Sequence, residues 1–252
     1  MPASARFWRR DEATVWRNGE KHLVKGVALE QDDGIEALER YYRMRAPEYD
    51  DIYARADDVR RGELASATEM MKSVVDGRRV LEVACGTGFW THIASEVATK
   101  IVAIDASSEM LDVAGQKKLR ADNVTFIKAD AYRLDEVPGT FDAGVASFWV
   151  SHVPKARLKS FLSAFHQRLG KRASVFMMDN FNTPGYGGEF LCKPGSQDTF
   201  KLRELADGSK HTIIKNYFDT NKLRYLFAPV SNQLVIGSGT YYWWLSYVTK
   251  GD

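Results

Sequence analysis

Two kinds of hydrophobic spacing alternate along the middle of the chain. Short apolar runs occur at residues 79–84, 100–105, 123–130, 141–148 and 173–180. Between them, residues 89–98, 107–119 and 155–169 carry apolar side chains every three or four positions, and residues 131–140 form a short connector. The first spacing is typical of buried strands and the second of helices. The alternation predicts an α/β fold with a Rossmann-like, doubly wound, mostly parallel sheet.

The residues before this region have a different pattern. Residues 1–30 are weakly periodic and are expected to form an arm whose order depends on packing. Helical spacing begins at Asp33, and Pro47 is expected to interrupt that helix after Ala46. A second helix is predicted over 58–75. We therefore expect an N-terminal arm with lid helices at 1–76 and a core at 77–252, forming one domain overall.

The pattern in about the last seventy residues predicts further strands after the alternating region. Segments 198–205 and 211–218 are rich in β-forming residues and flank Asp207-Gly208, which is a strong hairpin signal. This β-hairpin is expected within an insertion at about 181–217. A helix at 219–227 and strands at 232–237 and 240–248 follow, and we expect an antiparallel C-terminal edge strand.

Composition limits the class of protein. The 252 residues are 44% hydrophobic and 27% charged, close to soluble globular averages, and no run reaches the roughly 18 apolar residues of a membrane span. The net charge of +2 comes from interspersed charges, so no nucleic-acid partner is expected. The start lacks the apolar stretch of a secretory signal, and the two cysteines suit a reducing compartment. We expect a cytoplasmic protein without membrane contact, and no metal site.

The segment VLEVACGTGFW at 80–90 joins the first strand to a glycine turn. Gly86 and Gly88 suit a turn under a nucleotide-type cofactor, but Thr91 stands where a dinucleotide-binding turn has a third glycine. The NAD hypothesis is weakened by this difference. Glu82 would repel a pyrophosphate and attract a cation.

Acidic residues end the next two strands. Asp105 comes nineteen residues after Gly86, where an acid can accept hydrogen bonds from ribose hydroxyls. Asp130 ends the third strand and could accept a hydrogen bond from the amino group of a purine. Together with Glu82 beside a cation, these acids describe adenosine attached to an amino acid, which is S-adenosylmethionine.

Five segments in order, VLEVACGTG, VAIDASSEML, VTFIKADAYRL, FDAGVASFWVSHVP and RLGKRASVFMMDN, resemble the motifs of class I S-adenosylmethionine-dependent methyltransferases. The resemblance covers about 79–180. It implies that Glu82 reaches the amino group of the cofactor, that Asp105 holds the ribose and that Met110 packs on the adenine. The cofactor-binding residues it implies are Glu82, Ala84, Cys85, Gly86, Gly88, Asp105, Ala106, Met110, Asp130, Ala131 and Phe148. Ala84 departs from the family pattern, which has glycine there.

The N-terminal helix also matters for this resemblance. In similar enzymes such a helix lies over the cofactor, so Tyr42 and Arg45 are expected to meet the methionine carboxylate or close the pocket. The alternative is an amphipathic helix that only packs on the sheet. Tyr49 and Trp149 are expected to face the substrate.

The resemblance predicts methyl transfer to an oxygen or nitrogen of a small organic molecule, by in-line displacement in a largely apolar pocket. His152 follows the fourth strand and is the candidate general base, because its ordinary pKa suits proton removal near neutral pH. A histidine that only makes local hydrogen bonds is the alternative. An NAD(P)-linked oxidoreductase and a noncatalytic S-adenosylmethionine-binding protein are the alternative functions.

Overall fold

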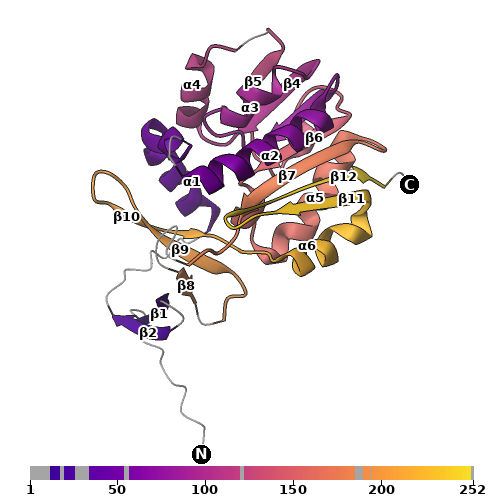
Figure 1. The fold of residues 1–252 in the computed structure, drawn as a ribbon. Coiled ribbons are helices and arrows are strands. Elements are labelled where there is room, and N and C mark those ends of the chain that lie inside the picture. Colours follow the sequence, from indigo (N-terminus) through magenta and orange to yellow (C-terminus); the bar gives the residue numbers. More distant parts are fainter. Residues whose placement is uncertain are drawn as a thin grey trace, which may run out of the picture.

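A seven-stranded sheet forms the centre of the protein (Figure 1). The computed structural model describes residues 12–17, 20–25, 34–53, 57–119, 122–184, 190–193 and 195–250, so parts of the predicted arm and insertion lie outside the described residues. The strands, in the order of the sheet, are β11 (Ser231–Ser238), β12 (Tyr242–Thr249), β7 (Ser174–Asn180), β6 (Ala143–Ser147), β3 (Arg79–Val83), β4 (Lys100–Asp105) and β5 (Val124–Lys128).

Parallel pairing joins the five strands that the sequence predicts in the middle of the chain. β3 pairs in parallel with β4 on one side and with β6 on the other. The strand order therefore reverses between β3 and β6, and ligands of such sheets bind outside the carboxyl ends of the strands at this reversal. β12 runs antiparallel to β7 and to β11, which confirms an antiparallel strand at this end of the sheet.

Helices cover both faces of the sheet, as the predicted alternation requires. On one face, α2 (Asp58–Val75), α3 (Phe89–Ala94) and α4 (Ser108–Gln116) pack against the strands. On the other face, α5 (Lys155–Leu169) and α6 (Thr220–Phe227) bury phenylalanines such as Phe161, Phe165 and Phe227. Side-chain caps fix several helix starts, because Asp57, Ser107 and Asp219 each accept a hydrogen bond from a backbone amide of the first turn.

The N-terminal helix breaks where Pro47 predicts. α1 (Ile35–Arg45) ends two residues before Pro47, and the 3₁₀ helix η1 (Ala46–Ile52), with Pro47 in its first turn, continues the chain. Leu38 and Tyr41 of α1 are buried against Leu205 and Ile213 of the insertion. α1 is thereby held between the insertion and α4. Three further short 3₁₀ helices are η2 (Leu134–Glu136), η3 (Val150–His152) and η4 (Ala228–Val230).

A second, antiparallel sheet lies beside the core (Figure 1). Its order is β10 (Lys210–Ile214), β9 (Thr199–Glu204), β8 (Phe190–Cys192), β1 (Glu12–Arg17) and β2 (Glu20–Lys25). The predicted hairpin is confirmed as β9 and β10, with Gly208 at a positive φ of 83° in the turn. The pairing of β1 with β8 is not predicted by the sequence, and it places part of the expected arm in the same sheet as the insertion.

The structure also bears on the cysteines and on membrane-crossing helices. Cys85 and Cys192 are both free thiols. Among the helices of the described residues, none combines the length and apolar character that a membrane crossing requires.

Candidate active site

A first cavity of about 90 Å³ lies at the carboxyl ends of β3, β4 and β6, and α1 covers it. The walls are largely apolar and include Ile35 and Leu38 of α1. The structure brings most of the candidate residues together there: Tyr42, Tyr49, Ala84, Gly86, Asp105, Ala106, Met110, Asp130, Ala131, Phe148, Trp149 and His152. Glu82, Cys85, Gly88 and Arg45 lie outside this lining.

Asp105 connects the glycine turn to the start of α4. Its Oδ2 atom accepts a hydrogen bond of 2.8 Å from the Gly86 amide, and Oδ1 accepts one of 2.9 Å from the Ser107 amide. The turn needs glycine for two different reasons. Gly86 has φ +56° with open space around it, whereas a side chain on Gly88 would meet the Cβ of Ala114 at 3.0 Å. Gly88, with φ +73°, therefore allows α4 to pack closely on the turn, and its expected contact with the cofactor stays a prediction.

Ala84 and Phe148, which line the first cavity, have left-handed backbone conformations. Their φ angles are +53° and +57°. This conformation is costly for residues with a Cβ, by about 1–2 kcal/mol. The departure from glycine at Ala84 therefore has an identifiable energetic cost.

Replacing Ala84 tests that cost. We expect Ala84→Gly to raise the free energy of unfolding by up to about 1 kcal/mol, and Ala84→Val to lower it by about 1–3 kcal/mol. The control is Ala65→Gly on the exposed face of α2, which should be destabilising by about 1 kcal/mol. Urea unfolding of the three variants measures the direction and size of each change in the free energy of unfolding. If Ala84→Gly lost as much stability as the control, the strain at Ala84 would be contradicted.

Glu82 is a buried acid without a partner for one oxygen. The residue is 2% exposed, and within the described part of the chain its Oε2 atom has no hydrogen-bond partner. Burial raises the pKa of Glu82 to about 8, and the neighbouring Asp105 carboxylate adds to the rise. A cation next to this oxygen would favour the ionised form.

The expected adenine side of the cavity contains Asp130, Ala131 and Met110. The Oδ1 atom of Asp130 accepts a hydrogen bond of 2.8 Å from the Tyr132 amide, and Met110 is almost fully buried. Glu39 of α1 also lines this cavity, a residue that the sequence analysis does not single out. Burial and the nearby Asp130 raise the pKa of Glu39.

His152 contacts the lid helix. Its Nε2 atom lies 2.8 Å from the hydroxyl of Tyr42, and its Nδ1 atom lies 2.7 Å from the carbonyl oxygen of Ile214. A carbonyl only accepts, so Nδ1 carries the proton and Nε2 accepts from Tyr42. Burial and the Lys215 ammonium lower the pKa of His152 to about 3, so the imidazole is neutral at pH 7.

η1 is attached to the glycine turn by contacts that the sequence analysis does not predict. Asp50 accepts hydrogen bonds from the Thr87 hydroxyl and from Lys117, which directly follows α4. Tyr53 stacks on Phe89, with ring centroids 3.6 Å apart and planes 5° from parallel. These contacts hold η1 and α1 over the first cavity.

A second cavity of about 400 Å³ adjoins the first. The two share Tyr42, Tyr49, Phe148 and His152. The walls of the second cavity are more polar, and they include four cationic side chains: Arg45, Arg60, Arg203 and Lys215. Arg45 lines the second cavity and not the first, so its expected contact with the methionine carboxylate or closure of the pocket stays a prediction.

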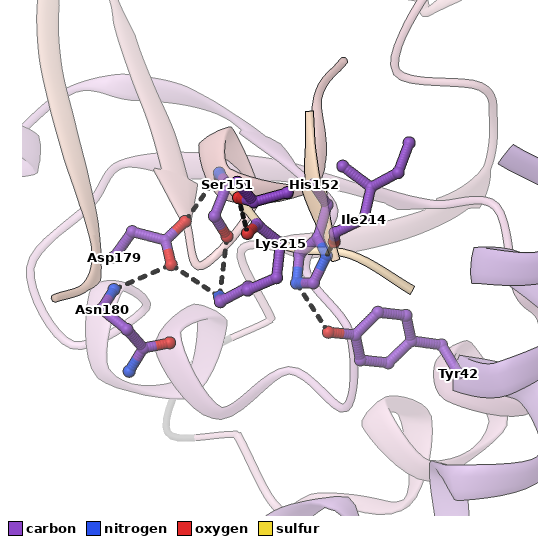
Figure 2. A network of polar contacts seen from close by, with 8 residues as sticks. Tyr42, Ser151, His152, Asp179, Asn180, Ile214 and Lys215 are labelled. Carbon is purple, nitrogen blue, oxygen red and sulfur yellow. Dashed lines mark hydrogen bonds and ion pairs between the residues drawn. The ribbon is translucent and has the colours of Figure 1, made fainter. Parts of the chain in front are cut away.

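A buried ion pair supports the wall of the second cavity (Figure 2). Lys215 donates to Asp179 Oδ1 at 2.8 Å and to the Ser151 hydroxyl at 2.7 Å. Asp179 also accepts from the backbone amides of Ser151 and Asn180. The side chains of Asp179 and Lys215 are 0% and 4% exposed. This network fixes η3, which carries His152, to β7 and to the end of β10.

Comparisons with known proteins agree with this geometry. Residues 80–172 match the family described as a methyltransferase domain. The demethylmenaquinone methyltransferase of Renibacterium salmoninarum is 34% identical over 115 residues, 45% of this chain and 45% of that protein. The one of Staphylococcus epidermidis is 31% identical over 133 residues, 52% of this chain and 48% of that protein. The chain thus spans about half the length of the curated relatives that it matches.

Solved structures extend the match to most of the chain. A complex of DhpI with SAH has a TM-score of 0.67 and 25% identity, and the match covers 87% of this chain and 98% of that one. A DhpI-SAM-HEP complex has a TM-score of 0.69 at 25% identity, covering 86% and 98%. Magnesium protoporphyrin IX methyltransferase from Synechocystis, with bound SAM, shares the fold at 14% identity with a TM-score of 0.60, covering 89% and 100%. Residues 80–172 thus form a methyltransferase domain, and the ordered motifs and the fold of the chain agree with those of class I S-adenosylmethionine-dependent methyltransferases.

Proposed function

We propose that the protein transfers a methyl group from S-adenosylmethionine, bound in the first cavity, to an oxygen or nitrogen of a small organic molecule in the second. The observation that carries this proposal is the contact between the two cavities, which share Tyr42, Tyr49, Phe148 and His152. The matches to a methyltransferase domain and to SAM and SAH complexes support it over the NAD(P)-linked alternative.

The donor set of this structure fits the cofactor. Glu82 presents a buried, unpartnered oxygen for an ammonium group, and Gly86 has open space beside its backbone. Asp105 and Asp130 would face the ribose and adenine, with Met110 and Ala131 beside the ring. The bound cofactor supplies an electrophilic methyl group on a sulfonium.

The covering helix has to move for the cofactor to enter. The open volume of about 90 Å³ is smaller than the roughly 300–1,000 Å³ usual for ligand pockets of this kind. α1 and η1 close this space through Tyr42, Tyr49 and the Asp50 contacts. We infer that α1 and η1 act as a lid that excludes water once it has closed, which favours aligned displacement over hydrolysis.

The residues at the shared boundary can take a proton from the acceptor. Burial raises the pKa of Tyr42 well above its usual value, so its phenol stays protonated and donates to His152 Nε2. An acceptor hydroxyl or ammonium beside Tyr42 could pass its proton to the Tyr42 oxygen while Tyr42 passes its own to His152. In this proposal His152 acts as the base through Tyr42 rather than by direct contact. Its pKa of about 3 makes it a weaker base than a histidine with the ordinary pKa that first suggested this role.

Cofactor binding should release a proton from Glu82. At pH 7 a carboxyl group with a pKa of about 8 is mostly protonated, and an adjacent ammonium would favour its ionised form. We expect about one proton per bound S-adenosylmethionine, and an affinity that rises with pH up to about 8. Titration calorimetry in two buffers of different ionisation enthalpy measures the release, with Glu82→Gln as the control that binds more weakly and releases none from this site. Equal wild-type enthalpies in both buffers would contradict the prediction.

Calorimetric titrations with S-adenosylmethionine and NADH, together with an acceptor screen by mass spectrometry, test the proposed function. Binding of S-adenosylmethionine and a product heavier by one methyl group are expected. Tight NADH binding without S-adenosylmethionine binding would favour the oxidoreductase. Binding of S-adenosylmethionine without turnover of any acceptor would instead favour the noncatalytic alternative.

A further inference from the structure

One acidic side chain of the lid helix faces the first cavity. The residues of α1 that line this cavity are Ile35, Leu38, Glu39 and Tyr42. This spacing places all four on one side of the helix. Glu36 and Arg43 are exposed and line neither cavity. Of the charged residues of α1, only Glu39 therefore faces the space that the cofactor is proposed to occupy.

The strongest charged neighbour of Glu39 comes from the core of the protein. Burial is the largest cause of the raised pKa of Glu39, and the Asp130 carboxylate is the next largest. Arg43 and Lys128 lower this pKa, and each has a smaller effect than Asp130. The Glu39 carboxylate also adds to the effect of burial that raises the pKa of Asp105. The lid thus places a carboxylate next to Asp130, at the expected adenine side of the cavity.

Both carboxylates have oxygen atoms that can accept further hydrogen bonds. The Oδ1 atom of Asp130 accepts from the Tyr132 amide at 2.8 Å. Within the described part of the chain, no hydrogen bond reaches Oδ2 of Asp130 or either oxygen of Glu39. Two neighbouring carboxylates repel each other, and a ligand that donates hydrogen bonds to both offsets part of this repulsion.

The adenine ring carries a group that matches two such acceptors. Its exocyclic amino group has two N–H donors, whereas an ionised carboxylate only accepts. Asp105 is expected at the ribose, so the amino group is left for the acids farther along the cavity. The buried, unpartnered oxygen of Glu82 is independent evidence that this region binds a ligand with hydrogen-bond donors.

We propose that Glu39 and Asp130 together bind the exocyclic amino group of the adenine, and that each carboxylate accepts a hydrogen bond from one of its two N–H groups. Asp130 belongs to the core and Glu39 to the lid, so the second hydrogen bond forms only when α1 covers the cofactor. Glu39 is then a specificity-determining residue. This inference rests on the proposed function and adds a residue to its cofactor site.

The same helix connects the base to the site of methyl transfer. Tyr42 lies three positions after Glu39, and its hydroxyl is 2.8 Å from His152 Nε2 at the boundary of the two cavities. A hydrogen bond between Glu39 and the adenine would therefore hold Tyr42 in the position from which it contacts His152. Recognition of the base is in this way coupled to closure of the lid.

Titration calorimetry with S-adenosylhomocysteine and S-inosylhomocysteine tests the inference. The second ligand has a keto oxygen in place of the amino group, and this oxygen would face two carboxylates. We expect the wild-type protein to bind S-adenosylhomocysteine about a hundredfold or more tightly. Glu39→Gln should reduce this preference about tenfold, because the glutamine amide can donate to the keto oxygen as well as accept from the amino group. Equal wild-type affinities for the two ligands would overturn the proposal.

Glu36→Gln is the matched control. It makes the same change three positions earlier on α1, at a residue that is exposed and does not line the cavity. Glu39 is also exposed, so neither variant is expected to disturb folding. A preference that is unchanged in Glu39→Gln, or equally reduced in Glu36→Gln, would refute the role of Glu39. Equal weakening of both ligands in Glu39→Gln would refute it too, since a contact with the ribose has that effect.

Binding of S-adenosylhomocysteine to the wild-type protein is measured first. If it binds and Glu39→Gln keeps the wild-type preference, the role of Glu39 is wrong while the proposed function stands. If it does not bind, the proposed function and this inference both fail.

Discussion

Asp179→Asn should lower the free energy of unfolding by about 3–5 kcal/mol, because it leaves the ammonium of Lys215 buried without its counter-charge. Burial alone favours the neutral carboxylic acid, but the Lys215 ammonium outweighs it and holds the pKa of Asp179 below its usual value. The wild-type pair is therefore ionised at pH 7. Urea unfolding of the purified variant measures the loss.

Lys215→Met removes the positive charge of the Asp179–Lys215 pair and is the counterpart of Asp179→Asn. It should cost a similar amount, whereas the double variant Asp179→Asn, Lys215→Met should recover part of the loss because no unpaired charge remains. Losses that simply add in the double variant would show that the two charges do not act as a pair. The pair is so deeply buried that salt should change none of these values much.

Tyr42→Phe and His152→Ala should each reduce turnover about a hundredfold or more, measured at saturating S-adenosylmethionine. Both changes remove one step of the proton path from the acceptor through Tyr42 to His152 Nε2. Because the two groups act in series, the double variant should be little slower than either single one. Tyr225→Phe is the control, since Tyr225 is 81% exposed on α6.

The pH profile separates this role from a structural one. With a pKa of about 3, His152 is neutral from pH 5 upward, so wild-type turnover should show no inflection near pH 6.5 from this residue. Unchanged rates in both single variants at every pH would leave His152 and Tyr42 as packing residues. If the variants raise only the KM for S-adenosylmethionine and leave turnover at saturation unchanged, then Tyr42 and His152 only help to close the first cavity.

Patterns of neighbouring residues predicted the helices and strands of the α/β core well, because these elements are determined mainly by residues close together in sequence. The apolar spacing at 58–75 corresponds to α2 with the same bounds, and Pro47 ends α1 where its ring excludes a continuing helix. Asp105 and Asp130 could be placed at one site because parallel strands end at the same edge of a sheet. Chain direction and strand order are enough for such a prediction.

Contacts between distant segments were not predictable in this way. Arg203 and Arg45 line one cavity only because the insertion packs on α1 through Leu38 and Ile213. The hydrogen bond between Tyr42 and His152 likewise depends on how the lid helix lies over the sheet. The sequence around each of these residues gives no sign of which distant residue it contacts. The second cavity and the charges that line it could therefore be recognised only from the structure.

The shared antiparallel sheet has a consequence for how the chain folds during synthesis. Thr14 of β1 pairs with Cys192 of β8, across most of the length of the chain. The ribosome therefore has to make nearly the whole core before the first strand can meet its neighbour, and closing so long a loop is slow. We expect the nascent chain to form the cofactor-binding layer first and to complete the second sheet last.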